Sequence, residues 1–143
     1  MDERTKNQCG SPSRDKFKRK HKDLSKHLWA LDVDFVLVEK HPFPDVVAIV
    51  DYKAGAHDSI TFTEVIAYNA FLNRGIPVYI VSGDADVGAF SIFCYEGGNH
   101  LKPTWKLRTV HETKTWEEFE DWETRLRNFR QSRWMAIDQR FSK

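Results

Sequence analysis

The segment from Val46 to Gly55, which reads VVAIVDYKAG, constrains the fold more than any other part of this 143-residue chain. Its apolar first half is typical of a buried strand, and a carboxylate and an ammonium, Asp51 and Lys53, follow at its end. Side chains alternate along a strand, so these two leave from the same face, roughly 6.6 Å apart along it. Burying a charge pair costs desolvation energy that packing does not require, which indicates a chemical role for this strand end.

A second apolar run, from Leu28 to Glu39, is predicted to form an antiparallel hairpin with the first run. The loop between them, from Lys40 to Pro44, contains two prolines and can continue neither strand. We expect Glu39 to pair with Val46 at the loop end of this hairpin.

This register predicts that Asp34 lies directly opposite Asp51, with Cβ atoms about 4.5–5.5 Å apart. Two carboxylates at this separation suit one shared cation, and they repel each other without it. The same register sets Asp32 opposite Lys53. A shift of two residues would exchange the roles of Asp32 and Asp34, so both remain candidates for the first metal ligand.

The two carboxylates and the lysine form a D-x16-D-x-K array that resembles the PD-(D/E)xK nuclease superfamily. The sequence DYKAG is especially similar to the second motif of the RecB-type branch, in which the following helix carries Q-x-x-x-Y. Here Glu64 and Tyr68 have that spacing, with Glu in place of Gln. The resemblance covers Leu28 to about Ser82. It implies an α/β fold with a restriction endonuclease-like core, in which helices flank a central mixed β-sheet.

The resemblance also implies an activity, the metal-dependent hydrolysis of phosphodiester bonds in DNA, with RNA left open as a substrate. Asp34 and Asp51, together with the backbone carbonyl of Tyr52, would hold Mg²⁺ or Mn²⁺. Lys53 would assist the attacking water, and Tyr68 would orient the site. A homo-oligomer or a larger nucleic-acid-processing complex is the expected assembly.

Other parts of the sequence match the family less closely. Asp45 follows Pro44 in a literal Pro-Asp pair, but it precedes Asp51 by six residues on one predicted strand. That separation is about 20 Å, too far for a shared metal. Many family members carry a further Glu or His ligand on their first helix, and the nearby candidates here are His21 and His27.

The helix after the DYK segment allows two interpretations of its polar residues. Thr61-x-x-Glu64 is a capping-box signature for a helix that ends near Gly75, and we favour this role for Glu64 over metal ligation. Tyr68 is either a site residue or a half-buried aromatic residue of the core. The apolar run Ile76–Ser82 then predicts a strand parallel to the DYK strand, because a helical crossover connects the two.

The last third of the chain predicts two strands and a helix. Phe90–Tyr95 alternates as an antiparallel edge strand, and Lys106–Val110 is the expected return strand. Thr115-x-x-Glu118 is a second capping box and predicts a long C-terminal helix with an apolar stripe that packs in the core. The arginines of its later turns are Arg125, Arg127, Arg130 and Arg133. They complement the helix dipole, and phosphate binding is the alternative.

The N-terminal region is basic although the net charge of the chain is only +1. Residues 1–11 are predicted to be a disordered tail, and residues 12–143 a single domain. A helix that opens at Pro12, with Phe17 directed inward, carries the residues predicted to bind nucleic acid: Lys18, Arg19, Lys20 and Lys22. An ordinary solvated helix face is the alternative.

The cysteine, histidine and apolar patterns of the sequence exclude several other classes of protein. Cys9 and Cys94 form neither a zinc set nor a disulfide framework, which predicts free thiols and a cytoplasmic location. No apolar run approaches the ~20 residues needed to span a bilayer, so no membrane partner is expected. No P-loop, G-x-S-x-G or H-x-H set supports another hydrolase.

Two alternatives to a nuclease remain. One is a non-catalytic nucleic-acid-binding module with Asp51 and Lys53 as a structural ion pair, and the other is a protein-interaction subunit that docks through its C-terminal helix.

Overall fold

The structure, a computed structural model, describes residues 12–22, 31, 33–54, 60–102 and 104–141, with side chains except those of residues 14, 18, 21, 22 and 134–141. The chain divides into two compact units, Met1–Asp32 and Val33–Lys143. The first unit contains helix α2 (Pro12–Lys22), and the second contains every described strand. The predicted disordered tail lies outside the described residues, and a single domain over residues 12–143 stays a prediction.

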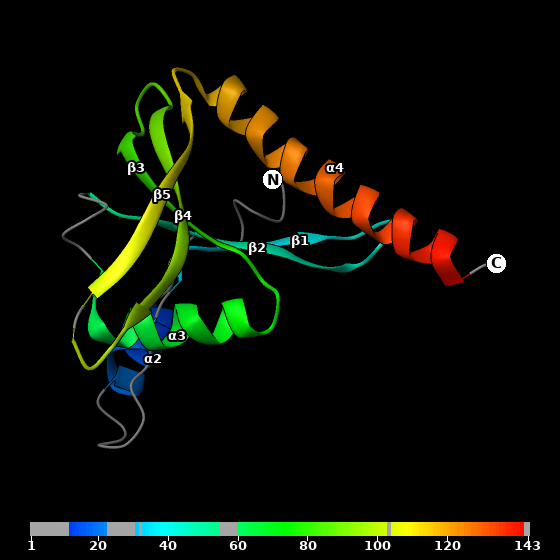
Figure 1. Cartoon of the computed structure of the whole chain (residues 1–143). Helices are drawn as coiled ribbons and strands as arrows, with labels where there is room; N and C mark the ends of the chain where they lie inside the picture. Colours follow the sequence, from blue (N-terminus) through cyan, green and yellow to red (C-terminus); the bar gives the residue numbers. More distant parts are fainter. Residues whose placement is uncertain (1–11, 23–30, 32, 55–59, 103, 142–143) are drawn as a thin grey trace. The chain divides into compact units, whose positions relative to one another are not determined.

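The second unit is an α/β structure built on a five-stranded mixed sheet (Figure 1). The β2–β3 pair is parallel and the other three pairs are antiparallel. The parallel pair is connected through helix α3 (Phe62–Asn73), which confirms the predicted crossover. The strands lie in chain order across the sheet: β1 (Phe35–Glu39), β2 (Asp45–Tyr52), β3 (Val78–Asp84), β4 (Ala89–Asn99) and β5 (Thr104–Thr113).

Helices cover both faces of this sheet. On one face Tyr68 of α3 and Ile49 of β2 share a buried apolar cluster. On the other face Trp122 of helix α4 (Trp116–Phe141) and Val50 of β2 belong to a second cluster. Figure 1 shows α4 running from the end of β5 toward the tip of the β1–β2 hairpin. Because neighbouring residues of β2 face different clusters, the strand reads as a continuous apolar run in the sequence.

The β1–β2 hairpin starts one residue away from the predicted register. Glu39 pairs with Asp45, whereas the sequence predicted Val46 as its partner, and a β-bulge follows in the middle of the pair. Beyond the bulge Phe35 pairs with Val50, as the predicted register requires. The extra residue of the bulge offsets the different starting pair, so the strand ends far from the loop are opposed as expected.

Three further expectations about the fold require correction. β4 was predicted as an edge strand, but β5 pairs along its outer side, so β1 and β5 are the edges of the described sheet. The strand expected to begin at Leu28 begins at Phe35, and residues 23–30 and 32 lie outside the described part of the chain. Phe17 of α2, expected to point inward, is 66% exposed.

Both helices of the second unit begin with capping interactions. The Oγ1 atom of Thr61 accepts a hydrogen bond from the Glu64 backbone N–H, and the Glu64 carboxylate accepts one from the Thr61 N–H, which confirms the first predicted capping box. At α4, the Glu118 N–H likewise donates to Thr115 Oγ1 at 3.2 Å. The Glu118 carboxylate, however, accepts from the backbone of Lys114 at 2.7 Å, so the second capping box is only half formed.

Candidate active site

Asp51 and Lys53 lie at the C-terminal end of β2, where the parallel strands β2 and β3 end side by side. Crevices at the carboxyl ends of parallel strands are common ligand sites. Asp51 is only 2% exposed, and the Lys53 N–H donates to the Val81 carbonyl of β3 at 2.9 Å. Asp45 is the first residue of the same eight-residue strand, so it lies at the opposite end, as the sequence predicted.

Asp34 reaches Asp51 from the other strand of the hairpin. It precedes β1 by one residue, and its backbone N–H donates to Oδ1 of Asp51 at 3.2 Å. In return, Oδ2 of Asp34 accepts from the backbone N–H of Tyr52 at 2.8 Å. The hairpin therefore brings an exposed carboxylate, Asp34, next to a buried one, Asp51. The alternative candidate, Asp32, lies outside the described residues.

Glu64 caps the helix and contacts Lys53 at the same time. Its Oε1 atom accepts from the Thr61 N–H at 2.9 Å, while its Oε2 atom accepts from Nζ of Lys53. The carboxylate is buried, and burial alone would raise its pKa. Hydrogen bonds from Lys53 and Thr61 outweigh burial and hold the pKa of Glu64 below its ordinary value. Capping and contact with the candidate site are therefore not alternatives.

Tyr68 connects the helix to the buried carboxylate. Its side chain is fully buried, more so than in the structural alternative of a half-buried core ring, and packs edge-on against Tyr95 with ring centroids 5.2 Å apart. Its hydroxyl hydrogen-bonds to Oδ2 of Asp51 and lies 2.9 Å from Oε2 of Glu64. Burial, and then the neighbouring Asp51, raise the pKa of Tyr68 well above its ordinary value, so the hydroxyl keeps its proton. Its single proton can be donated to only one of the two carboxylates, Asp51 or Glu64, at a time.

The described network carries more carboxylates than cations. Its cation is the ammonium of Lys53. Nζ of Lys53 lies 4.0 Å from Oδ2 of Asp51 and is nearer still to Oε2 of Glu64. Burial raises the pKa of Asp51 to about 6, although hydrogen bonds from Tyr68 and Asp34 and the charge of Lys53 oppose it. When all groups are ionised, two carboxylates contact the ammonium and a third, Asp34, lies beside Asp51, an excess of negative charge that favours a further cation.

The donor set fits a hard divalent cation. Asp34 and Asp51 offer carboxylate oxygens that have lone pairs beyond the hydrogen bonds above. Mg²⁺ takes one or two protein carboxylates and completes its shell with water or phosphate oxygens. Among the described residues no group of three or more His, Cys, Asp or Glu side chains could hold a metal, so the site would depend on these two carboxylates. The His21 side chain and all of His27 lie outside the described part.

A second charged cluster was missed by the sequence analysis. The buried Glu39 carboxylate at the end of β1 accepts hydrogen bonds from Arg127 Nε at 2.6 Å, Arg130 Nη1 at 2.7 Å and Gln131 Nε2 at 2.6 Å. These bonds tie the hairpin to α4. Strand alternation is the sequence signal that could have predicted the burial of Glu39. Glu39 shares a strand face with Leu37, and Leu37 packs against the apolar cluster that contains Trp122 of α4. Two of the C-terminal arginines thus bind a carboxylate, and since α4 continues to Phe141, they lie too far from its end for the predicted interaction with the helix dipole.

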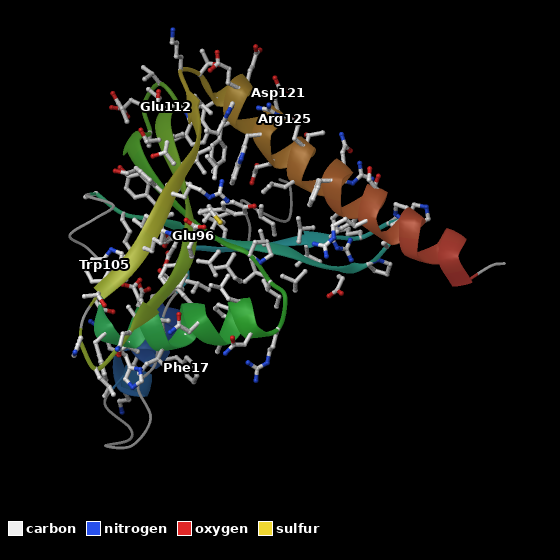
Figure 2. The ribbon with its side chains drawn as sticks, viewed as in Figure 1. Phe17, Glu96, Trp105, Glu112, Asp121 and Arg125 are labelled. Carbon is white, nitrogen blue, oxygen red and sulfur yellow. The ribbon has the colours of Figure 1, made fainter. Side chains whose placement is uncertain are left out.

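The remaining predicted basic residues lie on two helices. Arg19 and Lys20 of α2 are exposed, and α2 belongs to the first unit of the chain. Two more predicted residues of α2 have side chains outside the described set: Lys18 and Lys22. Arg125 of α4, labelled in Figure 2, places Nη2 3.0 Å from Nε2 of His111 in β5. Nucleic-acid binding by α2 stays a prediction.

Comparisons with protein-family models, curated proteins and solved structures gave no match for this chain. The resemblance to PD-(D/E)xK nucleases therefore rests on the motif residues themselves. None of the helices in the described part of the chain is both long and apolar enough to cross a membrane.

Proposed function

We propose that this chain is a metal-dependent nuclease of the PD-(D/E)xK type, similar to the RecB branch, that hydrolyses phosphodiester bonds in DNA. One observation carries the proposal: Asp34, just before β1, lies beside Asp51 and Lys53, which stand at the C-terminal end of the neighbouring strand β2. The mixed sheet with helices on both faces and a long C-terminal helix is compatible with a restriction endonuclease-like core, which is part of the proposal.

Asp34 and Asp51 are the proposed ligands of Mg²⁺ or Mn²⁺, with the Tyr52 carbonyl as a third. The backbone N–H of Tyr52 is directed at Asp34, and the N–H and C=O of one strand residue face the same neighbouring strand. A cation bound there would stabilise negative charge on the reacting phosphate and lower the pKa of a bound water. Asp51 is held in a single orientation by Tyr68 and by the backbone of Asp34.

Lys53 is the proposed group that orients the attacking water and offsets charge on the phosphate. Its side chain is 17% exposed, so its ammonium is close to the surface but is not freely mobile. Glu64 acts as a positioning residue, because its carboxylate holds Nζ of Lys53 while its other oxygen is fixed by the start of α3. Tyr68 has the same kind of role toward Asp51.

A non-catalytic function on the same fold is supported by one specific observation. Among the described residues, no buried side-chain nitrogen or oxygen lacks a hydrogen-bond partner. Lys53 and Glu64 therefore satisfy each other as a structural ion pair would, and the network is complete on its own. A nucleic-acid-binding or protein-interaction module would need no more than this.

Cleavage assays separate the two functions. Labelled single-stranded, duplex and branched DNA should be nicked or degraded with Mg²⁺ or Mn²⁺, and EDTA should stop the reaction. Asp34→Ala, Asp51→Ala and Lys53→Ala should be inactive, whereas Asp45→Ala removes an exposed carboxylate from the same strand and should remain active. No cleavage of any DNA form with either metal would favour the non-catalytic module. An inactive Asp45→Ala beside an active Asp34→Ala would overturn the ligand assignment.

A further inference from the structure

A cavity of about 600 Å³ lies at the end of β2 that is remote from the candidate active site. Its walls come from the start of β2, the end of α3 with the segment that follows it, and the middle of α4. Pockets of this volume typically hold small organic ligands. From Asp45 at the cavity to Asp51 the distance along the strand is about 20 Å, so an occupant would not reach the proposed metal ligands.

One part of the cavity lining is apolar. Leu72 and Ile76 contribute aliphatic carbon from the end of α3 and the segment behind it, and Tyr79 contributes a ring from β3. Phe129 of α4 also lines the cavity, and it remains 67% exposed. A large aromatic ring exposed at a pocket offers a face on which a flat ligand can stack.

The rest of the lining is positively charged. Three arginines line the cavity, Arg74, Arg130 and Arg133, against a single aspartate among the lining residues, Asp45. Arg130 is 14% exposed, and its charge is offset by Glu39 and by the lining Asp45, whose Oδ2 lies 3.8 Å from Nη2, so Arg74 and Arg133 supply the positive charge of the lining. Arg74 uses Nη1 for a carbonyl of its own helix at 3.0 Å, which leaves its other donors, and Arg133 is exposed. Guanidinium groups match the oxygens of a phosphate in pairs.

We propose that this cavity is a binding site for a small organic phosphate with a flat aromatic body, that is, a nucleotide. Arg74 and Arg133 bind the phosphate, and Phe129 with the apolar wall accommodates the base. A half-open cavity of about 600 Å³ with one aromatic face has room for a mononucleotide, whereas an extended strand would need a groove that continues beyond the cavity. The site is separate from the proposed nuclease site and does not depend on its chemistry.

Calorimetric titration of the full chain with AMP in EDTA tests the proposal, and adenosine and inorganic phosphate serve as probes of each half of the ligand. AMP should bind, and each half should bind about tenfold or more weakly than AMP, because each lacks one set of contacts. Phosphate that binds as tightly as AMP, or the absence of AMP binding at millimolar concentration, would overturn the proposal.

Variants locate the site. Arg74→Glu combined with Arg133→Glu should weaken AMP binding about tenfold or more, since each charged hydrogen bond contributes strongly to affinity. Phe129→Ala should weaken AMP binding but leave phosphate binding unchanged. Lys102→Glu combined with Lys106→Glu makes the same charge change at exposed positions outside the cavity and should have no effect.

A further variant separates this inference from the proposed nuclease. Asp51→Asn should bind AMP with wild-type affinity even though we expect it to be inactive. Circular dichroism and thermal unfolding should confirm that every variant is folded. AMP binding that survives the arginine reversal, or that is lost in Asp51→Asn, would show that the nucleotide binds elsewhere and would sink the proposal.

Discussion

Lys53 donates a hydrogen bond to Glu64 at the start of α3, whereas Asp51, two residues earlier on the same strand face, lies 4.0 Å from its ammonium. The other oxygen of Glu64 accepts from the Thr61 N–H. One carboxylate therefore couples the first turn of a helix to the proposed catalytic lysine. Movement of this helix end would disturb Lys53, and loss of Lys53 would leave a buried carboxylate without its cation.

Two substitutions at Glu64 should remove its contacts stepwise. Glu64→Gln keeps one oxygen acceptor, which can serve either the Thr61 N–H or Lys53 while the amide NH2 faces the other donor, so we expect the free energy of unfolding to fall by about 1 kcal/mol and cleavage to be partly retained. Glu64→Ala removes both contacts and should lower the free energy of unfolding by about 1–3 kcal/mol. Cleavage should also fall at least about tenfold as Lys53 loses its position. Urea unfolding and kcat measure the two effects, and equal behaviour of the two variants would contradict this role for Glu64.

Metal binding should depend on Asp51. The Asp51→Asn side chain keeps an oxygen for the Asp34 N–H, can donate its NH2 to the Tyr68 oxygen while that hydroxyl donates to Glu64, and buries no charge, so the metal-free variant should be at least as stable as metal-free wild type. Mg²⁺ should raise the Tm of wild type, since a ligand at 100 times its Kd stabilises the folded state by about 2.7 kcal/mol. The variant should show no such shift. Asp45→Asn is the matched control and should keep it. A Tm increase of equal size in Asp51→Asn would mean that the ion binds elsewhere.

Acid should weaken the contact between the hairpin and α4. Burial alone would raise the pKa of Glu39, but hydrogen bonds from Gln131 and Arg127 and the charges of Arg127 and Arg130 bring it below the ordinary value of 4.5. Folding therefore favours the ionised carboxylate. Its contribution is complete above about pH 4.5 and is lost as the pH falls through the lower pKa of the folded state.

Thermal unfolding across this pH range measures the effect. Glu39→Gln should lower the Tm at neutral pH, and the difference from wild type should shrink as the pH falls below about 4.5. Glu96→Gln is the matched control, because Glu96 faces Arg108 across 3.5 Å in an exposed pair that should contribute little. A constant difference between wild type and Glu39→Gln at every pH would argue against an ionised contact.

The basic helix α2 can be tested by salt dependence. If it lies along phosphates, log K for duplex DNA should fall with log salt by about 0.9 per contact. A fourfold Gln variant should lower this slope by about two to four units and leave the cleavage pattern unchanged, because phosphate contacts position without specifying sequence. Its substitutions are Lys18→Gln, Arg19→Gln, Lys20→Gln and Lys22→Gln. Identical slopes for the variant and wild type would leave α2 as a solvated helix.

The sequence alone determined the local elements of the second unit. The capping box of Thr61 and Glu64 starts α3, and the apolar run that ends before Asp51 forms a buried strand. A helix connects this strand to the next apolar run, and the two strands are therefore parallel neighbours. The C-terminal helix starts after Thr115, as predicted. These features depend on residues close together in the chain, whose capping bonds and side-chain periodicity are set by backbone geometry.

Tertiary structure decided which distant charges meet. Spacing placed Lys53 on the face of Asp51, but the position of α3 over that face made Glu64 the closer partner and buried Tyr68 between the two carboxylates. The burial of Glu39 against α4 likewise depends on how a helix from the other end of the chain crosses the hairpin. A side chain accepts the partner that packing brings within hydrogen-bond distance, and spacing along the chain does not specify that distance.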